Sequence, residues 1–523
     1  MKKLFSTLLL CIGAISALNA QTEYRNPIIP GCYPDPSICR VGDSYFLVNS
    51  TFHYFPAVPL WHSKDLVHWE QIGNVLDRDS QVNLSGTMRG SGIYAPTIRY
   101  DESDGTFYMV TTNITNGGNF FVTTKDPRNG WSEPIFLQQQ GIDPSFYFEK
   151  GTCYMLSNPD NCICLCTVDK KTGKQLTPSR PLWEGTGGRY PEAPHLIRKD
   201  GWYYLLISEG GTEYGHMVTI ARSRDIYGPY EANPGNPILT HRDMSAQNNP
   251  IQATGHADMV QAPDGSWWMV CLGIRPQTGQ NHLLGRETFL APVRWEKGGW
   301  PIVNETGTIS LEMKANLPSW HPTEPEPDRQ VFSSEPLGPE WVYVRNPQRD
   351  KYENRMNALA LHGTDATLDA TEKSPTMVLR RQRSINCDVS TTLALSDAQA
   401  GDEAGLCVFL DAGKHYDIFL RENGGSRSLV LRYRLDYLTH TEKEVEIPED
   451  AKVRLCIHCT ADSYSFSYSL GEDGEPVYMG TMGSRYLSEE VNGGFTGCLF
   501  GLYCISARET AVAEFESFVE KRY

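Results

Sequence analysis

Three carboxylates lead copies of one repeated sequence element. Asp35, Asp143 and Glu192 open the segments DPSI, DPSF and EAPHL, in which a polar residue precedes a short apolar strand. The matching positions of two further copies are Ala95 in APTI and His256 in HADMV. If the copies are structurally equivalent, the three carboxylates converge, and like charges held together raise the pKa of at least one of them. Structural need alone rarely assembles such a cluster, so the pattern indicates a functional site.

A protonated carboxylic acid that faces an ionised carboxylate is the arrangement that cleavage of a glycosidic bond requires. The acid donates a proton to the leaving oxygen, and the carboxylate activates water or attacks carbon. A third carboxyl group can hold the pKa and the orientation of the acid. The alternative is a cation site, in which the same groups are oxygen ligands for calcium. The pattern favours catalysis over metal binding.

The elements that carry these residues recur about every 50 to 60 residues. Each copy is followed by a Gly-containing turn and an aromatic and aliphatic strand, as in VGDSYFLVNS, DGTFYMVTTN and DGWYYLLIS. Units of several short strands with Gly and Asp turns are typical of four-stranded propeller blades. Five units predict a five-bladed β-propeller whose innermost strands bring the leading residues to the axis. An irregular β-sandwich with coincidental repeats is the alternative.

The chain divides into four predicted segments and is all-β throughout. Residues 1–20 have the lysines, apolar run and final small residue of a secretory signal peptide, which predicts a periplasmic or secreted protein. Residues 21–318 form the predicted propeller, and the Pro- and Glu-rich stretch 319–330 a linker. Residues 331–523 contain alternating apolar runs such as YSFSYSL, which predict a C-terminal β-sandwich.

Composition and charge exclude several classes of partner. The 523 residues include 47 Lys and Arg against 63 Asp and Glu, a formal net charge of −16, which disfavours nucleic-acid binding. No apolar run after the first 20 residues is long enough to predict a membrane span. The 14 cysteines leave 13, an odd number, after that leader, so they cannot all pair within one chain. The oligomeric state does not follow from the sequence.

At these residues the sequence resembles glycoside hydrolase family 43, specifically its long β-xylosidase and α-L-arabinofuranosidase members. The resemblance is carried by YPDPS, YAPTIRY, GIDPSFYF, PEAPHLIRKDGWYYLLISEGGTEYGH and LGRETFLAPVRW, and it continues in LGPEWVYVRNP and GGFTGCLFGLY. It implies a propeller followed by a concanavalin A-like, jelly-roll sandwich. It also implies an exo-acting, inverting hydrolase that releases terminal xylose from xylan-derived oligosaccharides.

Three other functions stay open. The first is an α-L-arabinofuranosidase, or a bifunctional enzyme, acting on arabinoxylan or arabinan side chains. The second is a non-catalytic carbohydrate-binding propeller, against which the intact set of carboxylates counts. The third is a fructan-active enzyme that retains configuration, with its two carboxyl groups about 5–5.5 Å apart instead of the 6.5–9.5 Å of an inverting enzyme.

The resemblance also implies roles for individual residues. Asp35 corresponds to the general base, Glu192 to the general acid, and Asp143 to the carboxylate that modulates the pKa of the acid and orients substrate. Arg286 in LGRET corresponds to an arginine near the sugar and near Asp143, where its charge would help keep that carboxyl ionised. His256 corresponds to an axial histidine that contacts a water or a calcium. No cofactor is required, and a structural calcium at the propeller axis stays an alternative.

Five further residues are predicted to line the substrate pocket. Phe52, Phe55 and Thr212 lie in matching motifs, and Tyr94 stands where many relatives have Trp. Phe495 in GGFTG is predicted to reach from the sandwich to the mouth of the pocket.

Overall fold

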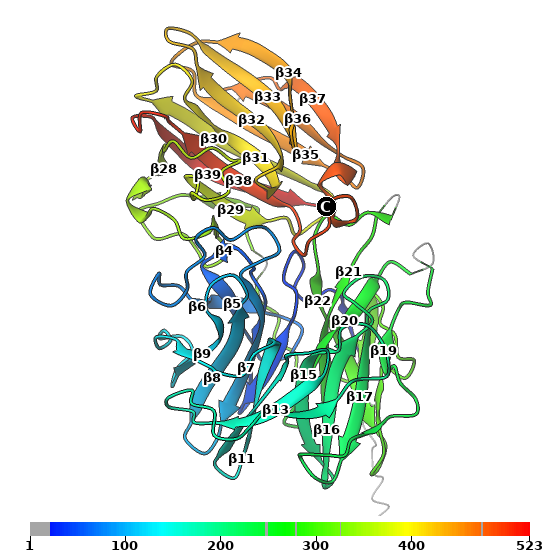
Figure 1. Ribbon diagram of the computed structural model, residues 1–523. Coiled ribbons are helices and arrows are strands. Elements are labelled where there is room, and N and C mark those ends of the chain that lie inside the picture. The colour runs from blue at the N-terminus through cyan, green and yellow to red at the C-terminus, as the bar shows by residue number, and fades with distance from the viewer. Residues whose placement is uncertain (1–20, 246–248, 278–279, 325, 472–473) are drawn as a thin grey trace, which may run out of the picture.

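The computed structural model describes residues 21–523 except 246–248, 278–279, 325 and 472–473. The predicted signal peptide, residues 1–20, lies outside the described residues. Two all-β bodies follow one another along the chain: the propeller, coloured blue to green in Figure 1, and the sandwich, yellow to red. None of the helices in the described part is sufficiently long and apolar to cross a membrane.

The propeller consists of five antiparallel sheets, one for each predicted repeat. Each sheet runs outward from the strand nearest the axis, and each repeat supplies its first two strands from the two recurring elements. The first blade comprises β2 (Ser37–Val41), β3 (Ser44–Val48), β5 (Ala57–Ser63) and β6 (Glu70–Leu76). The second comprises β7 (Ile93–Asp101), β8 (Thr106–Asn113), β9 (Gly118–Thr124) and β10 (Ile135–Phe136).

The other three blades repeat this order. The third comprises β11 (Ile142–Glu149), β12 (Thr152–Asn158), β13 (Ile163–Val168) and β14 (Arg180–Trp183). The fourth comprises β15 (Glu192–Lys199), β16 (Trp202–Glu209), β17 (Met217–Ser223) and β18 (Glu231–Ala232), with β19 (Leu239–Thr240) also paired to β17. The fifth comprises β20 (Gln252–Gln261), β21 (Trp267–Ile274), β22 (Glu287–Trp295) and β23 (Pro301–Val303).

Apolar side chains between neighbouring sheets hold the ring together. Phe46 on β3 and Phe107 on β8, for example, meet edge to face with their ring centres 5.0 Å apart, a favourable aromatic geometry. The two ends of the propeller sequence also pair, since β1 (Thr22–Arg25) and β24 (Glu312–Ala315) form a two-stranded antiparallel sheet.

The C-terminal body is a sandwich of two antiparallel sheets. One sheet contains β25 (Arg329–Val331), β27 (Tyr352–Arg355), β28 (Ala358–His362), β30 (Cys387–Ser396), β35 (Val453–Cys459), β36 (Ser463–Leu470), β37 (Val477–Gly483) and β39 (Val512–Arg522). The other contains β29 (Met377–Arg381), β31 (Glu403–Asp411), β32 (Lys414–Glu422), β33 (Arg427–Leu435), β34 (Leu438–Ile447) and β38 (Leu499–Ile505). Three short helical turns complete it: η2 (Arg349–Lys351), η3 (Ser484–Leu487) and α1 (Glu489–Asn492).

The alternation of apolar residues builds the core of this sandwich. On β36, Tyr464, Phe466 and Tyr468 are buried while the serines between them are half-buried, because successive side chains of a strand point to opposite faces. β25 begins at Arg329 and pairs with β39, so the sandwich sheet starts inside the stretch 319–330 that was predicted to be a linker. All 13 cysteines of the described chain are free thiols.

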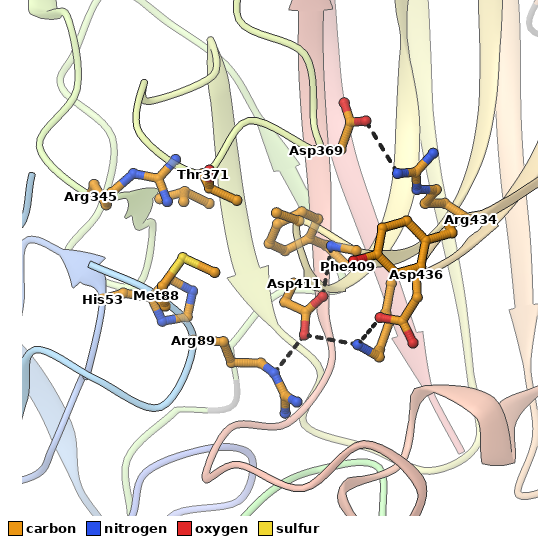
Figure 2. A pocket seen from close by; sticks show the side chains of 15 residues that line it. His53, Met88, Arg89, Arg345, Asp369, Thr371, Phe409, Asp411, Arg434 and Asp436 are labelled. Atoms are coloured by element: carbon orange, nitrogen blue, oxygen red, sulfur yellow. Dashed lines mark hydrogen bonds and ion pairs between the residues drawn. The ribbon is translucent and has the colours of Figure 1, made fainter. Parts of the chain in front are cut away.

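The propeller and the sandwich are joined by strand pairing and by ion pairs. β26 (Tyr343–Val344), at the start of the sandwich sequence, pairs with β4 (Tyr54–Phe55) of the propeller. A cavity of about 460 Å³ lies at this junction, and Figure 2 shows hydrogen bonds and ion pairs among the residues that line it. Arg89 of the propeller contacts Asp411 of the sandwich at 2.6 Å. None of the three predicted catalytic carboxylates lines this cavity.

Candidate active site

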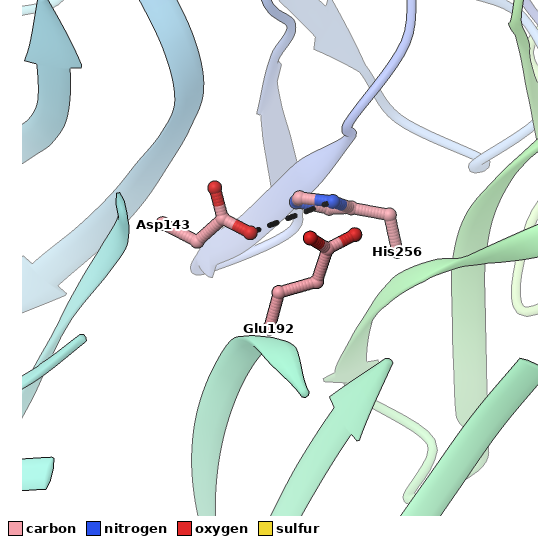
Figure 3. Close-up of side chains that lie close together, drawn as sticks. All are labelled: Asp143, Glu192 and His256. Carbon is pink, nitrogen blue, oxygen red and sulfur yellow. Dashed lines mark ion pairs between the residues drawn. The ribbon is translucent and has the colours of Figure 1, made fainter. Parts of the chain in front are cut away.

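The residues at the leading position of the sequence repeat converge in the propeller. Asp143, Glu192 and His256 come from β11, β15 and β20, and Figure 3 shows their side chains pointing toward one another. One polar atom of each lies within 4.8 Å of the others. Asp35, two residues before β2, joins them through His256, whose Nδ1 is 3.5 Å from Asp35 Oδ1. The sequence repeat thus correctly predicts a meeting of carboxylates from separate blades.

Register shifts in the innermost strands set the direction of these side chains. The pairing register shifts where Asp143 and Glu192 lie, between Ile142 and Ser145 on β11 and between Glu192 and His195 on β15. Such bulges re-aim side chains and are common beside active sites. Asp35 (55°), Asp143 (54°) and His256 (46°) also have positive φ, a conformation that costs non-glycine residues about 1–2 kcal/mol.

Hydrogen bonds hold two of the carboxylates in place. Ser50 Oγ donates to Asp35 Oδ2 at 2.6 Å and accepts from the Ala95 backbone N at 2.7 Å. Asp143 Oδ2 accepts from the Ala193 backbone N at 3.0 Å. His256 Nδ1 lies 4.0 Å from the same Asp143 oxygen, so its imidazole stands between two carboxylates. Sequence reasoning missed Ser50, which sits at the end of a repeat element and carries no motif of its own.

The three carboxyl groups do not have equivalent environments. Burial, together with the charges of Asp143 and Asp35, raises the pKa of Glu192 well above its usual range. Burial also raises the pKa of Asp143 to about 6, where the Asp35 charge adds to the rise and His256 and the Ala193 N–H oppose it. Of these two carboxyl groups, Glu192 is therefore the one whose environment more strongly favours the protonated form.

A buried histidine lies close to Glu192. His216 Nε2 is 4.0 Å from Glu192 Oε1, and His216 Nδ1 lies 3.1 Å from the Ala253 carbonyl oxygen. Burial, with the charge of His256, lowers the pKa of His216 to about 3. The imidazole is consequently neutral, with its proton on Nδ1 for that carbonyl and an unpaired Nε2 that faces Glu192.

The three carboxyl groups and His256 line a cavity of about 120 Å³, a volume on the scale of one sugar ring. Most of the predicted pocket residues belong to its wall, together with Ala95 and Ile142. The full lining is Asp35, Phe52, Tyr94, Ala95, Ile142, Asp143, Glu192, Thr212, His256, Arg286 and Phe495.

Phe55 was predicted to line the pocket, and this prediction is wrong. Its side chain is fully buried in the core between the first two blades. Its strand, β4, pairs with β26 of the sandwich, and the Arg349 guanidinium lies 5.3 Å from the centre of its ring. Phe55 therefore stabilises the interface between the two bodies, while Phe52, three residues earlier, faces the cavity.

Phe495 reaches the pocket from the sandwich, as predicted. Its ring stacks near Phe52 with centres 6.0 Å apart and lies 6.1 Å from the ring of Tyr94. Phe52 and Tyr94 in turn meet edge to face at 5.6 Å. Three aromatic rings from two bodies thus form one side of the cavity, an apolar surface suited to the C–H face of a sugar.

Arg286 occupies the pocket but has a different partner from the one expected. Its Nη2 donates to Glu489 Oε1 at 2.7 Å and to the Thr212 carbonyl oxygen at 3.3 Å. The positive charge of Arg286 opposes the rise in the pKa of Glu192. The sequence had instead predicted that this charge acts on Asp143. Sequence reasoning missed Glu489, because a glutamate on a sandwich turn gives no sign that it contacts a propeller about 200 residues away.

The cluster fits calcium poorly as a direct ligand set. Its three groups are two carboxylates and one imidazole, whereas calcium takes six to eight oxygen ligands. The raised pKa of Glu192 also makes that carboxyl group a poorer ligand for a cation, because its environment favours the protonated form. A calcium at the axis that His256 contacts through water stays a prediction.

Comparisons with known proteins agree on one family. Residues 24–301 match the family described as glycosyl hydrolases family 43, and residues 329–520 match the β-xylosidase C-terminal concanavalin A-like domain. A non-reducing end α-L-arabinofuranosidase of Bacteroides ovatus is 42% identical over 494 residues, 92% of each chain. A xylosidase/arabinosidase of Butyrivibrio fibrisolvens is 37% identical over 517 residues, 93% of this chain and 96% of that protein.

Solved structures show the same relationship. A Bacteroides ovatus family 43 protein from a xyloglucan utilisation locus superposes with a TM-score of 0.90 at 40% identity, covering 96% of this chain and 100% of that one. A xylan β-1,4-xylosidase from Bacillus halodurans superposes with a TM-score of 0.89 at 31% identity, covering 95% and 100%.

Proposed function

Because the chain belongs to glycosyl hydrolases family 43, and is thus a glycosidase, we propose that it is an exo-acting, inverting enzyme that releases terminal xylose from xylan-derived oligosaccharides. One observation carries this proposal. A glutamic acid whose pKa is well above its usual range shares a cavity of about 120 Å³ with two aspartates from other blades. An acid and a base with separated pKa values are what glycoside hydrolysis needs.

Each carboxyl group has a distinct task in this mechanism. Glu192 donates its proton to the glycosidic oxygen as the bond to the leaving sugar breaks. Asp35, held by Ser50 and facing His256, takes a proton from the water that attacks the anomeric carbon. The charge of Asp143 keeps Glu192 protonated until the reaction begins. Inversion requires room for the water, so we expect the Asp35 and Glu192 carboxyl groups to lie about 6.5–9.5 Å apart.

The shape of the cavity supports exo action. It accommodates one sugar ring, and Phe495 of the sandwich stands at its wall. Two buried nitrogens of Arg286, Nε and Nη1, have no hydrogen-bond partner among the residues that the structure describes. Since buried donors are costly when unpaired, these two are suited to hydroxyl groups of the bound sugar.

The second candidate activity is that of an α-L-arabinofuranosidase. The relative at 42% identity is named a non-reducing end α-L-arabinofuranosidase, and the one at 37% a xylosidase/arabinosidase. Both activities remove a terminal pentose with the same acid and base, so the carboxylates alone do not separate them. The wall residues Phe52, Tyr94 and Thr212 line the cavity, and we propose that they determine which pentose fits.

Hydrolysis of two aryl pentosides, measured side by side, tests the proposal. We expect turnover of para-nitrophenyl β-D-xylopyranoside above that of para-nitrophenyl α-L-arabinofuranoside, with α-xylose as the first product by proton NMR. The reverse preference would assign the second candidate activity. A β-anomer would disprove inversion, and absence of turnover on both, with measurable sugar binding, would favour a binding protein. Glu192→Gln is the matched control, because it keeps the shape and removes the proton donor.

A further inference from the structure

A cluster of four charged residues joins the sandwich to the propeller beside the catalytic cavity. His282 and Arg286 precede β22 of the propeller, and Glu489 and Glu490 begin α1 of the sandwich. The His282 and Arg286 side chains are 4% and 3% exposed, and that of Glu489 is 12% exposed. Charges buried this deeply are costly unless each is paired. The pairing within the cluster therefore shows which side chains it orients.

The two glutamates enclose the histidine from both sides. His282 Nδ1 lies 2.6 Å from Glu490 Oε1, and His282 Nε2 lies 3.1 Å from Glu489 Oε2. Burial alone would lower the pKa of His282, but these two carboxylates raise it to about 9. The imidazole is therefore protonated at neutral pH and donates from both nitrogens. It fixes Glu489 Oε2 and leaves Oε1 free to accept from Arg286 at 2.7 Å.

Arg286 has room to leave its position. A second cavity of about 480 Å³ adjoins the catalytic one, and the two share Thr212, Arg286 and Phe495 in their walls. The guanidinium carbon lies 5.0 Å from the centre of the Phe495 ring, a contact that a displaced side chain could make from several directions. Arg286 Nη2 also donates to the Thr212 carbonyl oxygen at 3.3 Å, so the Glu489 carboxylate, at 2.7 Å, supplies the shorter and charged restraint on its direction.

We propose that Glu489 is a positioning residue for Arg286, held in turn by His282, so that the sandwich supplies part of the machinery of the catalytic pocket. This inference rests on the proposed function of that pocket. Its consequence is that Arg286 keeps its guanidinium in the cavity wall and its charge near Glu192 only while α1 is docked. Loss of the Glu489 charge should therefore weaken sugar binding and change the titration of Glu192 without touching any group that contacts the substrate.

The test is Glu489→Gln in the full-length chain. We expect kcat/KM on the better pentoside to fall about tenfold or more, as for other buried charge pairs with one partner removed, and KM to rise more than kcat falls. We also expect the alkaline limb of the kcat/KM profile to move to higher pH, because a loosened Arg286 no longer lowers the pKa of Glu192. The control is Glu509→Gln, which removes an exposed ion pair with Lys351 elsewhere on the sandwich.

Each outcome bears on the inference separately from the proposed function. The inference is overturned if the wild type is active, the kcat/KM of Glu489→Gln lies within about threefold of the wild-type value, and the alkaline limb of its pH profile does not move. A lower Tm with unchanged kinetics would show a purely structural role and would also overturn it. If the wild type hydrolyses neither pentoside, the proposed function fails. A crystal structure of the variant then tests the inference, which predicts that the Arg286 guanidinium has left its wild-type position.

Discussion

At the scale of single residues, the site separates the pKa values of carboxyl groups that lie close together. Glu192 and Asp143 are both raised by burial, but Glu192 is raised further because the charges of Asp143 and Asp35 act on it as well. The backbone N–H of Ala193 and the imidazole of His256 limit the rise at Asp143. A small set of contacts therefore decides which carboxyl keeps its proton at neutral pH.

Asp143→Asn should move the pH profile and stabilise the fold. Without the Asp143 charge, the pKa of Glu192 falls, so the alkaline limb of kcat/KM moves to lower pH while kcat drops. The pKa of Asp143 is about 6 in the folded protein against an ordinary value of 3.8. The folded state thus binds more protons in that window, and stability is lost as pH rises through it. Removing the charge should raise Tm at pH 7 by roughly 2–4 °C.

Kinetics across pH and calorimetry at pH 7 and pH 4 check this prediction. The gain in Tm should vanish at pH 4, where Asp143 is protonated in the folded wild-type protein. An unmoved alkaline limb, or a lower Tm at pH 7, would show that Asp143 does not act through its charge.

At the scale of elements, the sequence predicts what is local and repeated. Each repeat carries its own Gly turn, and four of the five carry a polar leading residue, so the five blades and the convergence of Asp35, Asp143 and Glu192 follow from pattern alone. The bulges that aim these side chains do not follow, because positive φ at Asp143 or His256 depends on neighbouring strands. Phe55 was misplaced for a related reason, since its partner strand β26 lies nearly 300 residues further along the chain.

Gly255 is required where β20 is irregular. A Cβ at this position would lie 2.3 Å from the His216 ring, whose Nε2 faces Glu192 at 4.0 Å. Gly255→Ala should therefore destabilise the protein by about 1–3 kcal/mol and lower kcat by pushing His216 toward the acid. Gly235→Ala is the control, because its Cβ would meet Asn233 at an ordinary 3.4 Å. Tm and kcat that are equal in the two variants would contradict this role of Gly255.

At the scale of the whole molecule, the catalytic pocket is shared between two bodies. Phe495 and Glu489 come from the sandwich, and the three carboxyl groups that line the cavity, Asp35, Asp143 and Glu192, come from the propeller. Arg89 of the propeller contacts the segment between Glu489 and Phe495. It donates to the carbonyl oxygens of Asn492 at 2.8 Å and Gly493 at 2.6 Å. A single sequence predicts each body separately, but it does not show these contacts, which depend on how the two bodies dock.

Arg89→Ala should loosen the segment that carries Phe495. The variant loses both carbonyl contacts and the ion pair with Asp411 at 2.6 Å, so we expect KM to rise several-fold with a smaller change in kcat. Arg349→Ala is the control, because Arg349 also faces the propeller from the sandwich but forms a half-exposed pair with Asp79 at 3.5 Å. Steady-state kinetics on the better pentoside check this prediction, and an equal KM in both variants would refute it.

The pairing of β1 with β24 has a consequence for how the protein is made. Thr22 lies opposite Ala315, so the first strand has no partner until nearly 300 further residues have been synthesised. Contacts this distant in sequence form late and slow folding, while blades such as β11 to β14 need only neighbouring residues. During synthesis each blade can therefore fold as its own residues emerge from the ribosome. The pairing of β1 with β24, which closes the ring, forms only after the last blade has emerged.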